Sequence, residues 1–179
     1  MNRTPFLAAG VLTGLALVAA VVALLAGGRT APAVAATPTW KAPGGAWTIA
    51  APKGWHAVAL KGGGAVLQRA DRRGTVVVRP AGAIKAGYPA LVKQLTASLK
   101  RRFTDVQTAD VRTAPLGSGT GLLYSFVRTR ARTVQAIAVA PAGPRRSYVL
   151  NVVAPGGTAS VVREMAAMVR SFRLTPQGR

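Results

Sequence analysis

Three apolar runs decide the fold: Leu122-Leu-Tyr-Ser-Phe-Val-Arg128, Thr133-Val-Gln-Ala-Ile-Ala-Val-Ala140 and Ser147-Tyr-Val-Leu-Asn-Val-Val-Ala154. Each is rich in β-branched and aromatic residues and is bounded by turn-forming residues, a pattern typical of β-strands. The segments between them, Thr129-Arg-Ala-Arg132 and Pro141-Ala-Gly-Pro144, are short. Connections this short join antiparallel neighbours, so the three runs are predicted to form an antiparallel sheet.

The same kind of pattern continues outward from this segment. Five further strands are predicted before it, at residues 47–51, 55–60, 65–69, 75–79 and 106–115. Apolar residues at helical spacing predict helices over 88–103 and 158–172. The order is therefore four strands, a helix, four strands and a helix. We expect an α+β fold, an antiparallel β-sheet of about six to eight strands covered by two main helices.

The N-terminal segment predicts the compartment. A charge-free stretch runs from Thr4 to Gly28, and its central residues 6–25 are apolar on every side. About 20 such residues in a helix span a bilayer core of roughly 30 Å. We expect residues 1–28 to be a signal anchor or a signal peptide. The length of the stretch favours the uncleaved anchor, whereas Ala33-Val-Ala-Ala36 resembles a cleavage site for a removed peptide.

These features divide the chain into four parts. After the N-terminal helix, residues 29–45 are predicted to form a Pro-, Ala- and Gly-rich linker, residues 46–174 a globular domain and residues 175–179 a flexible tail. An anchor leaves the protein in the plasma membrane with a single pass and the domain outside the cytoplasm. Cleavage near Ala35 or Ala36 would instead give a secreted protein.

The composition argues against most enzyme chemistry. The 179-residue chain has 24 Lys and Arg but only 4 Asp and Glu, 1 His and no Cys, for a formal net charge of +20. Paired carboxylates, cysteine nucleophiles and Cys/His metal sites need residue types that are scarce here. Gly117-Ser-Gly-Thr-Gly121 precedes a strand and not a helix, so it predicts a hairpin loop and not a nucleophile turn. We expect no enzyme activity, catalytic residue, metal or cofactor. His56 is expected to face solvent or to be a strand histidine with its hydrogen bonds satisfied.

Two local patterns resemble a known family. A strand, Trp47-Thr-Ile-Ala-Ala51, runs into Pro52-Lys-Gly-Trp55, and the closing helix ends in Arg170-Ser-Phe172-Arg. Both patterns are similar to PsbP-like domains, including the LpqN-type envelope lipoproteins of actinobacteria, over about residues 46–174. The resemblance implies a PsbP-like sandwich and a non-enzymatic binding or accessory domain. This chain departs from the lipoprotein members because it has no lipobox Cys, so the resemblance implies no lipid anchor.

The remaining functional signal is the basic charge. Alternation would project Arg128, Arg130 and Arg132 from one face of a strand end or hairpin tip, and guanidinium groups suit phosphate and carboxylate oxygens. Arg145 and Arg146 are grouped with them, and a further cluster ends the first helix. The candidate anion-binding residues are Lys100, Arg101, Arg102, Arg128, Arg130, Arg132, Arg145 and Arg146. The alternative is that these side chains only keep a basic domain soluble.

Two functions fit these observations. The first is a non-enzymatic extracytoplasmic domain that binds a protein partner or an apolar cargo through its sheet or a pocket between sheet and helix. The alternative is an electrostatic adhesion module that holds anionic cell-wall polymer or lipid headgroups through its arginine clusters. The membrane is the expected partner of residues 6–25. Export, and the lack of a nucleic-acid-binding motif in the sequence, argue against a nucleic-acid partner.

Overall fold

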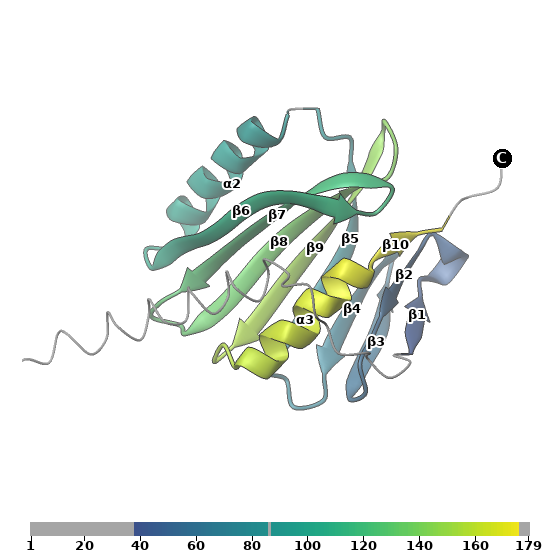
Figure 1. Ribbon diagram of the computed structural model, residues 1–179, viewed down its shortest axis with the longest axis horizontal. Coiled ribbons are helices and arrows are strands. Elements are labelled where there is room, and N and C mark those ends of the chain that lie inside the picture. Colours follow the sequence, from purple (N-terminus) through teal and green to yellow (C-terminus); the bar gives the residue numbers. More distant parts are fainter. Residues whose placement is uncertain (1–37, 86, 176–179) are drawn as a thin grey trace, which may run out of the picture.

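The computed structural model describes residues 38–85 and 87–175. These ranges contain ten strands, two α-helices and one 3-10 helix, labelled as in Figure 1. In chain order they are β1 (Thr39–Lys41), η1 (Pro43–Gly45), β2 (Trp47–Ala50), β3 (Trp55–Leu60), β4 (Gly64–Arg69), β5 (Thr75–Gly82), α2 (Tyr88–Arg102), β6 (Val106–Leu116), β7 (Gly119–Arg128), β8 (Thr133–Pro141), β9 (Arg146–Pro155), α3 (Ala159–Ser171) and β10 (Arg173–Leu174).

Seven strands form the main antiparallel sheet, in the order β3-β4-β5-β9-β8-β7-β6. Strands that are consecutive in the chain are neighbours except at the centre, where β5 pairs with β9. That pairing runs from Thr75 opposite Val153 to Gly82 opposite Arg146. Helix α2 carries the chain from β5 to β6 at the far edge of the sheet (Figure 1). Within the described residues β3 and β6 are the edge strands, and Val58 of β3 is 63% exposed.

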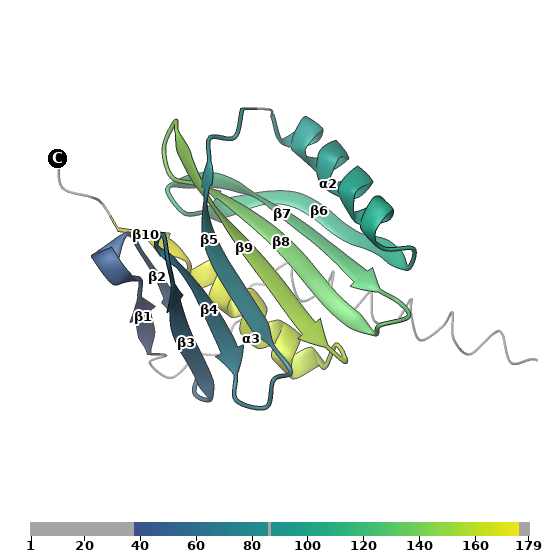
Figure 2. The same cartoon turned by 180° about the vertical axis from the view of Figure 1, so that it is seen from behind.

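The two α-helices cover opposite faces of this sheet. Helix α3 lies in front of the strands in Figure 1 and behind them in Figure 2, and its apolar face, which includes Met165, packs in the larger core. Helix α2 packs through Leu99 against Tyr124 and Phe126 in a smaller core. The alternation of side chains along β7 explains the division, because Leu123 belongs to the larger core and its neighbour Tyr124 to the smaller one.

A second sheet, in the order β1-β2-β10, joins the two ends of the described chain. Trp47 of β2 and Phe172 after α3 are both fully buried, and their ring centroids lie 5.5 Å apart. Tyr148 of β9 packs against both rings, and Trp40 of β1 packs against Trp47. This aromatic cluster fixes α3 and the small sheet to the main sheet, since aromatic side chains bury large apolar areas.

The structure confirms the α+β class, the antiparallel strands and the two covering helices. The predicted strands and helices all occur, with ends displaced by up to three residues. The sequence patterns do not predict β1, η1 or β10, which are too short to show a period. They also do not predict that β2 leaves the main sheet for a separate small one.

The predicted domain boundaries need correction at both ends. The linker over 29–45 ends earlier than expected, because Thr39–Lys41 is β1 and Pro43–Gly45 is η1, so the globular domain begins before residue 46. At the other end, Thr175 donates a backbone hydrogen bond to Ala46 and belongs with the fold. The predicted helix of residues 1–28 lies outside the described residues. None of the helices within them has the length and hydrophobicity to span a membrane.

Gly74, just before β5, is expected to tolerate no side chain. A Cβ at this position would lie 2.7 Å from the Trp55 ring and 2.9 Å from a Val161 methyl group. Gly74→Ala should therefore lower the free energy of unfolding by about 1–3 kcal/mol, as overpacking does. Urea unfolding followed by tryptophan fluorescence measures the change. Gly82→Ala is the control, because nothing lies within 4 Å of a Cβ there; equal losses in the two variants would contradict this explanation.

Candidate functional site

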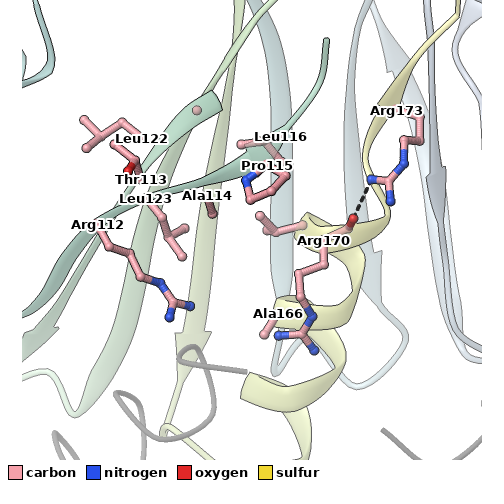
Figure 3. Close-up of a pocket in the computed structure, with 12 residues that line it drawn as sticks. Arg112, Thr113, Ala114, Pro115, Leu116, Leu122, Leu123, Ala166, Arg170 and Arg173 are labelled. Atoms are coloured by element: carbon pink, nitrogen blue, oxygen red, sulfur yellow. Dashed lines mark hydrogen bonds between the residues drawn. The ribbon is translucent and has the colours of Figure 1, made fainter. Parts of the chain in front are cut away.

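An apolar pocket of about 410 Å³ lies between α3 and the strands β6 and β7 (Figure 3). This volume is in the range of small-molecule binding sites. Three arginines from different elements complete the wall: Arg112 of β6, Arg170 of α3 and Arg173 of β10. The apolar part of the wall includes Pro115, Leu116, Leu123, Ala166 and Val169. The pocket therefore combines an apolar interior with cationic side chains.

A β-bulge turns Arg112 toward this pocket. The register of β6 on β7 shifts between Thr108 and Asp110, so one residue of β6 has no partner. Before the bulge, the Thr108 hydroxyl lies 2.9 Å from the Tyr124 hydroxyl on the face covered by α2. After it, Arg112 pairs with Leu123, which packs in the core under α3. Without the extra residue, the alternation of side chains would place Arg112 on the face of Thr108.

The three arginines differ in their partners. Arg173 Nη1 donates to the carbonyl oxygens of Arg170, at 2.6 Å, and Phe172, at 2.9 Å, so it is held at the end of α3. Arg112 Nε lies 3.3 Å from Asp110 Oδ2, yet these two buried atoms make no hydrogen bond. Arg170 has no carboxylate partner among the described residues, and Figure 3 shows its side chain and that of Arg112 extending to the same side. Both keep N–H groups available to an anionic ligand.

The structure brings six of the eight predicted anion-binding residues to one end of the main sheet. Lys100, Arg101 and Arg102 end α2, and Val106 then begins β6 opposite Arg128 at the end of β7. The β7–β8 turn that follows contains Arg130 and Arg132. Figures 1 and 2 both show the last turn of α2 close to this turn.

Arg145 and Arg146 lie apart from that group. Arg145 lies in the β8–β9 turn and Arg146 begins β9, next to the pair of Pro141 and Ser147, whereas the β7–β8 turn starts where Arg128 pairs with Thr133. Strand β8, nine residues long, separates the two turns by about 30 Å at 3.3 Å per residue. The expected grouping of Arg145 and Arg146 with the other arginines is therefore wrong.

Arg128 is engaged within the fold. Its Nε donates to Asp105 Oδ1 at 2.5 Å, and its guanidinium carbon lies 3.9 Å from the centroid of the Phe103 ring. Asp105 Oδ2 also accepts from the backbone N–H groups of Arg130 and Ala131. The hydrogen bond from Arg128 lowers the pKa of the Asp105 carboxyl; burial opposes this shift, and the backbone donors add to it. Asp105 and Arg128 thus hold the β7–β8 turn in place.

Arg130 and Arg132 do not continue the strand. Both are turn residues, and Arg132 has a φ angle of 48°, in the left-handed region. These residues therefore lie at a hairpin tip, one of the two predicted places, but the strand-like alternation expected to project them from one face requires extended backbone and does not continue through the turn. The side chains of Arg130 and Arg132 are exposed, as are those of Lys100, Arg101 and Arg102.

The carboxylates of the described residues all pair with arginine. Asp71 and Glu164 pair with Arg69, Asp110 with Arg112, and Asp105 with Arg128. His56 is exposed on β3, which is the first of the two expected environments. The described ranges contain no cluster of His, Cys, Asp or Glu that could hold a metal ion. Gly117 and Ser118 form the β6–β7 turn, which confirms the predicted hairpin.

A second cavity, of about 390 Å³, lies between α2 and the sheet. Its walls include Ile84, Leu91, Leu95, Ile137 and Val149, and Lys85 is its one charged side chain. The pocket under α3 differs in having three arginines. Sequence reasoning did not select Arg112, Arg170 or Arg173, because these residues come from distant segments and form no cluster in the chain. The one signal that could have found them is a charged pair, Asp110 and Arg112, inside a predicted strand.

The antiparallel sheet with one helix on each face is the architecture of PsbP-like domains, so the structure confirms the fold that the Pro-x-Gly-Trp start predicts. The solution structure of cyanobacterial PsbP (CyanoP) from Synechocystis sp. PCC 6803 is similar, with a TM-score of 0.56 and 10% identity, over 83% of this chain and 98% of that one. The crystal structure of LpqN, involved in cell envelope biogenesis of Mycobacterium tuberculosis, has a TM-score of 0.51 and 17% identity, over 80% of this chain and 88% of that one. No family model matches the chain, and no curated protein matches it by sequence. At these identities the likeness defines the fold alone.

Asp105 is expected to make stability depend on pH. Its pKa is lowered in the folded state, so the ionised carboxylate stabilises the fold above its ordinary value of 3.8, and this stabilisation is lost as the pH falls through the lower folded value. Asp105→Asn should lower the urea midpoint at about pH 7, and the difference from the unsubstituted protein should shrink between about pH 5 and 3. Asp71→Asn removes an exposed carboxylate and is the control. A difference that stays constant with pH would contradict this role of Asp105.

Proposed function

We propose that this chain is a non-enzymatic accessory domain that works outside the cytoplasm and holds an apolar ligand with an anionic group. The observation that carries the proposal is the pocket between α3 and β6–β7, which joins an apolar interior to the Arg112 and Arg170 side chains. The apolar part of the ligand fills the pocket, and its carboxylate or phosphate accepts hydrogen bonds from these guanidinium groups.

The electrostatics of the pocket support this ligand class. Within the described residues, the carboxylate that pairs with Arg112 is that of Asp110, and the closest atoms of the pair lack hydrogen bonds, so the pair is incompletely satisfied. Buried polar atoms without partners are costly, and an anionic group that accepts from Arg112 would satisfy part of this site. An uncharged apolar ligand would offer neither arginine an acceptor. The pocket is therefore better suited to an amphiphile than to a neutral hydrocarbon.

The proposed location rests on the N-terminal sequence. Residues 6–25 form a single-pass anchor in the plasma membrane, and the domain lies outside the cytoplasm; release after cleavage near Ala35 or Ala36 is the alternative. The similar structure of LpqN, a protein involved in cell envelope biogenesis, supports an envelope location for this fold. The scarcity of acidic residues and His, and the arginine partners of the described carboxylates, support a binding role without catalysis.

Ligand binding can be tested with a long-chain diazirine fatty acid added to the full-length protein in lipid vesicles. Photo-crosslinks are expected on peptides from β6 and the C-terminal half of α3. The double variant Arg112→Gln with Arg170→Gln should reduce crosslinking about tenfold or more, since each lost charge-assisted hydrogen bond contributes about 1.5–3 kcal/mol. Quantitative mass spectrometry of the crosslinked peptides gives the measurement.

Two controls separate a specific site from general attraction. Arg145→Gln with Arg146→Gln removes the same charge from exposed residues that do not line the pocket and should leave crosslinking unchanged. A diazirine fatty alcohol of the same length, which lacks the anionic group, should crosslink less to the unsubstituted protein. Crosslinks spread over the whole surface, or equal labelling by acid and alcohol, would contradict the proposed ligand class.

The membrane anchor makes a separate prediction. Mass spectrometry of the protein from the membrane fraction should find the N-terminal peptides of residues 1–28 still attached. A mature N-terminus near Thr37, found in the medium, would show instead that the segment is a cleaved signal peptide. This measurement is independent of the ligand experiment, because it reads the ends of the chain and not the pocket.

A second candidate function is electrostatic adhesion to anionic wall polymer or lipid headgroups. The observation that favours it is the convergence of Lys100, Arg101, Arg102, Arg130 and Arg132 at one end of the sheet. Binding of this kind falls steeply with salt, because the Debye length shortens from about 10 Å at 0.1 M to about 3 Å at 1 M. Ligand binding in the pocket should depend on salt much less.

A further inference from the structure

The described chain enters the fold at the same end of the molecule as the converging basic residues. Ala51 N–H donates to the Pro38 carbonyl oxygen, so Pro38 lies beside the connection between β2 and β3. Strand β3 then starts with Trp55 opposite Arg69, the last residue of β4. We call the end of the main sheet that contains the start of β3, the β4–β5 turn and the β7–β8 turn the entry end. The lower edge of the sheet in Figure 1 shows it.

The entry end is defined by strand register and not only by the view. Gln68 of β4 lies opposite Thr75 of β5, and Thr75 lies opposite Val153 of β9. Further across, Pro155 of β9 lies opposite Thr133 of β8, which follows the β7–β8 turn. The same end of the sheet therefore contains the start of β3, the β4–β5 turn, the β7–β8 turn and the end of α2. Seven strands about 4.8 Å apart make this end about 30 Å wide.

Exposed cations line this end without carboxylate partners in the described part of the chain. The three carboxylates present there are Asp71, Asp105 and Glu164, and each is already paired with Arg69 or Arg128. The exposed cations without such a partner are Lys53, Arg72, Arg73, Lys100, Arg101, Arg102, Arg130 and Arg132. The opposite end is also basic, through residues such as Lys61, Arg145 and Arg146. Charge alone therefore does not choose between the ends.

The length of chain before Pro38 determines which end of the sheet can face the membrane. If residues 6–25 span the membrane, twelve residues, 26–37, connect the membrane to the entry end. Fully extended, they reach about 40 Å at 3.3 Å per residue. To turn the opposite end toward the membrane, they would have to run past strands of up to 11 residues, about 36 Å long, and so be almost fully extended. The conformational entropy of residues 26–37 thus favours the arrangement in which the entry end faces the membrane.

We propose that the entry end docks on the anionic phospholipid headgroups of the membrane in which the chain is anchored. The linker holds the eight exposed cations within reach of the phosphates, and an end about 30 Å wide lets several of them make contact together. This orientation rests on the membrane anchor of the proposed function and is independent of the ligand pocket. It holds the domain upright on the bilayer, with the pocket, which is lined by the second half of β6 and the C-terminal half of α3, away from the docked surface.

Energy transfer from single labels to the membrane tests the orientation. The chain has no Cys, so one introduced Cys can be labelled without background. Ala131→Cys places a donor dye in the exposed β7–β8 turn, and Pro144→Cys places it in the exposed β8–β9 turn at the opposite end. The full chain is reconstituted in vesicles of phosphatidylglycerol and phosphatidylcholine, or of phosphatidylcholine alone, with an acceptor dye on a small fraction of the headgroups. Transfer should be high from residue 131 only, and only in the anionic vesicles at low salt.

Matched charge variants give the decisive comparison. Arg101→Gln, Arg130→Gln and Arg132→Gln together remove three cations from the entry end, and should lower transfer from residue 131 to its level in neutral vesicles. Lys61→Gln, Arg145→Gln and Arg146→Gln remove the same charge from the opposite end, and should leave it unchanged. Arg128 is kept, because it pairs with Asp105.

Three results would overturn the proposal. Equal transfer from the two labels would show that the domain has no fixed orientation, and an equal effect of the two variants would show attraction without a docking surface. Release of the chain from vesicles by alkaline carbonate would remove the anchor on which the orientation rests. Fatty-acid crosslinking in the pocket, measured on the same vesicles, should not change in the entry-end variant, so failure of the docking surface and failure of the ligand site give different results.

Discussion

The pairing of β5 with β9 is the interaction on which the rest of the structure depends. It joins strands that are separated by a helix and three other strands, so a long loop must close before any of its hydrogen bonds form. We call this strand pair the β5–β9 seam. Val76 and Val78 of β5 and Leu150 of β9 are fully buried along it, and their burial offsets the entropy of closing the loop. Without the seam, the hairpins on either side would be two small sheets with no common core.

The seam also creates the two cavities. It leads the chain through α2 to the far edge of the sheet, so α2 covers only the β6–β8 side of one face. On the other face, α3 returns over the centre of the sheet and is held near β2 by the packing of Trp47 on Phe172. A curved sheet with a helix fixed at its centre leaves a gap at its β6–β7 side, and the bulge before Asp110 turns an arginine into that gap. The pocket is thus a consequence of topology plus one inserted residue.

Most of the fold can be predicted from the sequence because strands such as Thr133-Val-Gln-Ala-Ile-Ala-Val-Ala140 and the helix around Met165 carry clear periods. Short elements such as β1 and β10 exist only through pairing with β2, which no local pattern encodes. The candidate site is less predictable for a related reason. Arg112 and Arg170 become neighbours only after a bulge and a long-range packing contact, whereas Arg128 and Arg145, close in the chain, lie at opposite ends of β8.

The free edge of β3 gives the basic charge a further role. An edge strand exposes backbone groups that can pair with a second molecule, and β3 contains no Lys, Arg, Asp or Glu and exposes Val58. Lys53 and Lys61 stand just beyond its two ends, so an antiparallel pair of β3 strands would bring the lysines of one molecule beside those of the other. The net charge of +20 adds repulsion between whole molecules. The basic charge therefore also keeps copies of the chain from associating edge to edge, and this protection weakens wherever salt screens the charge.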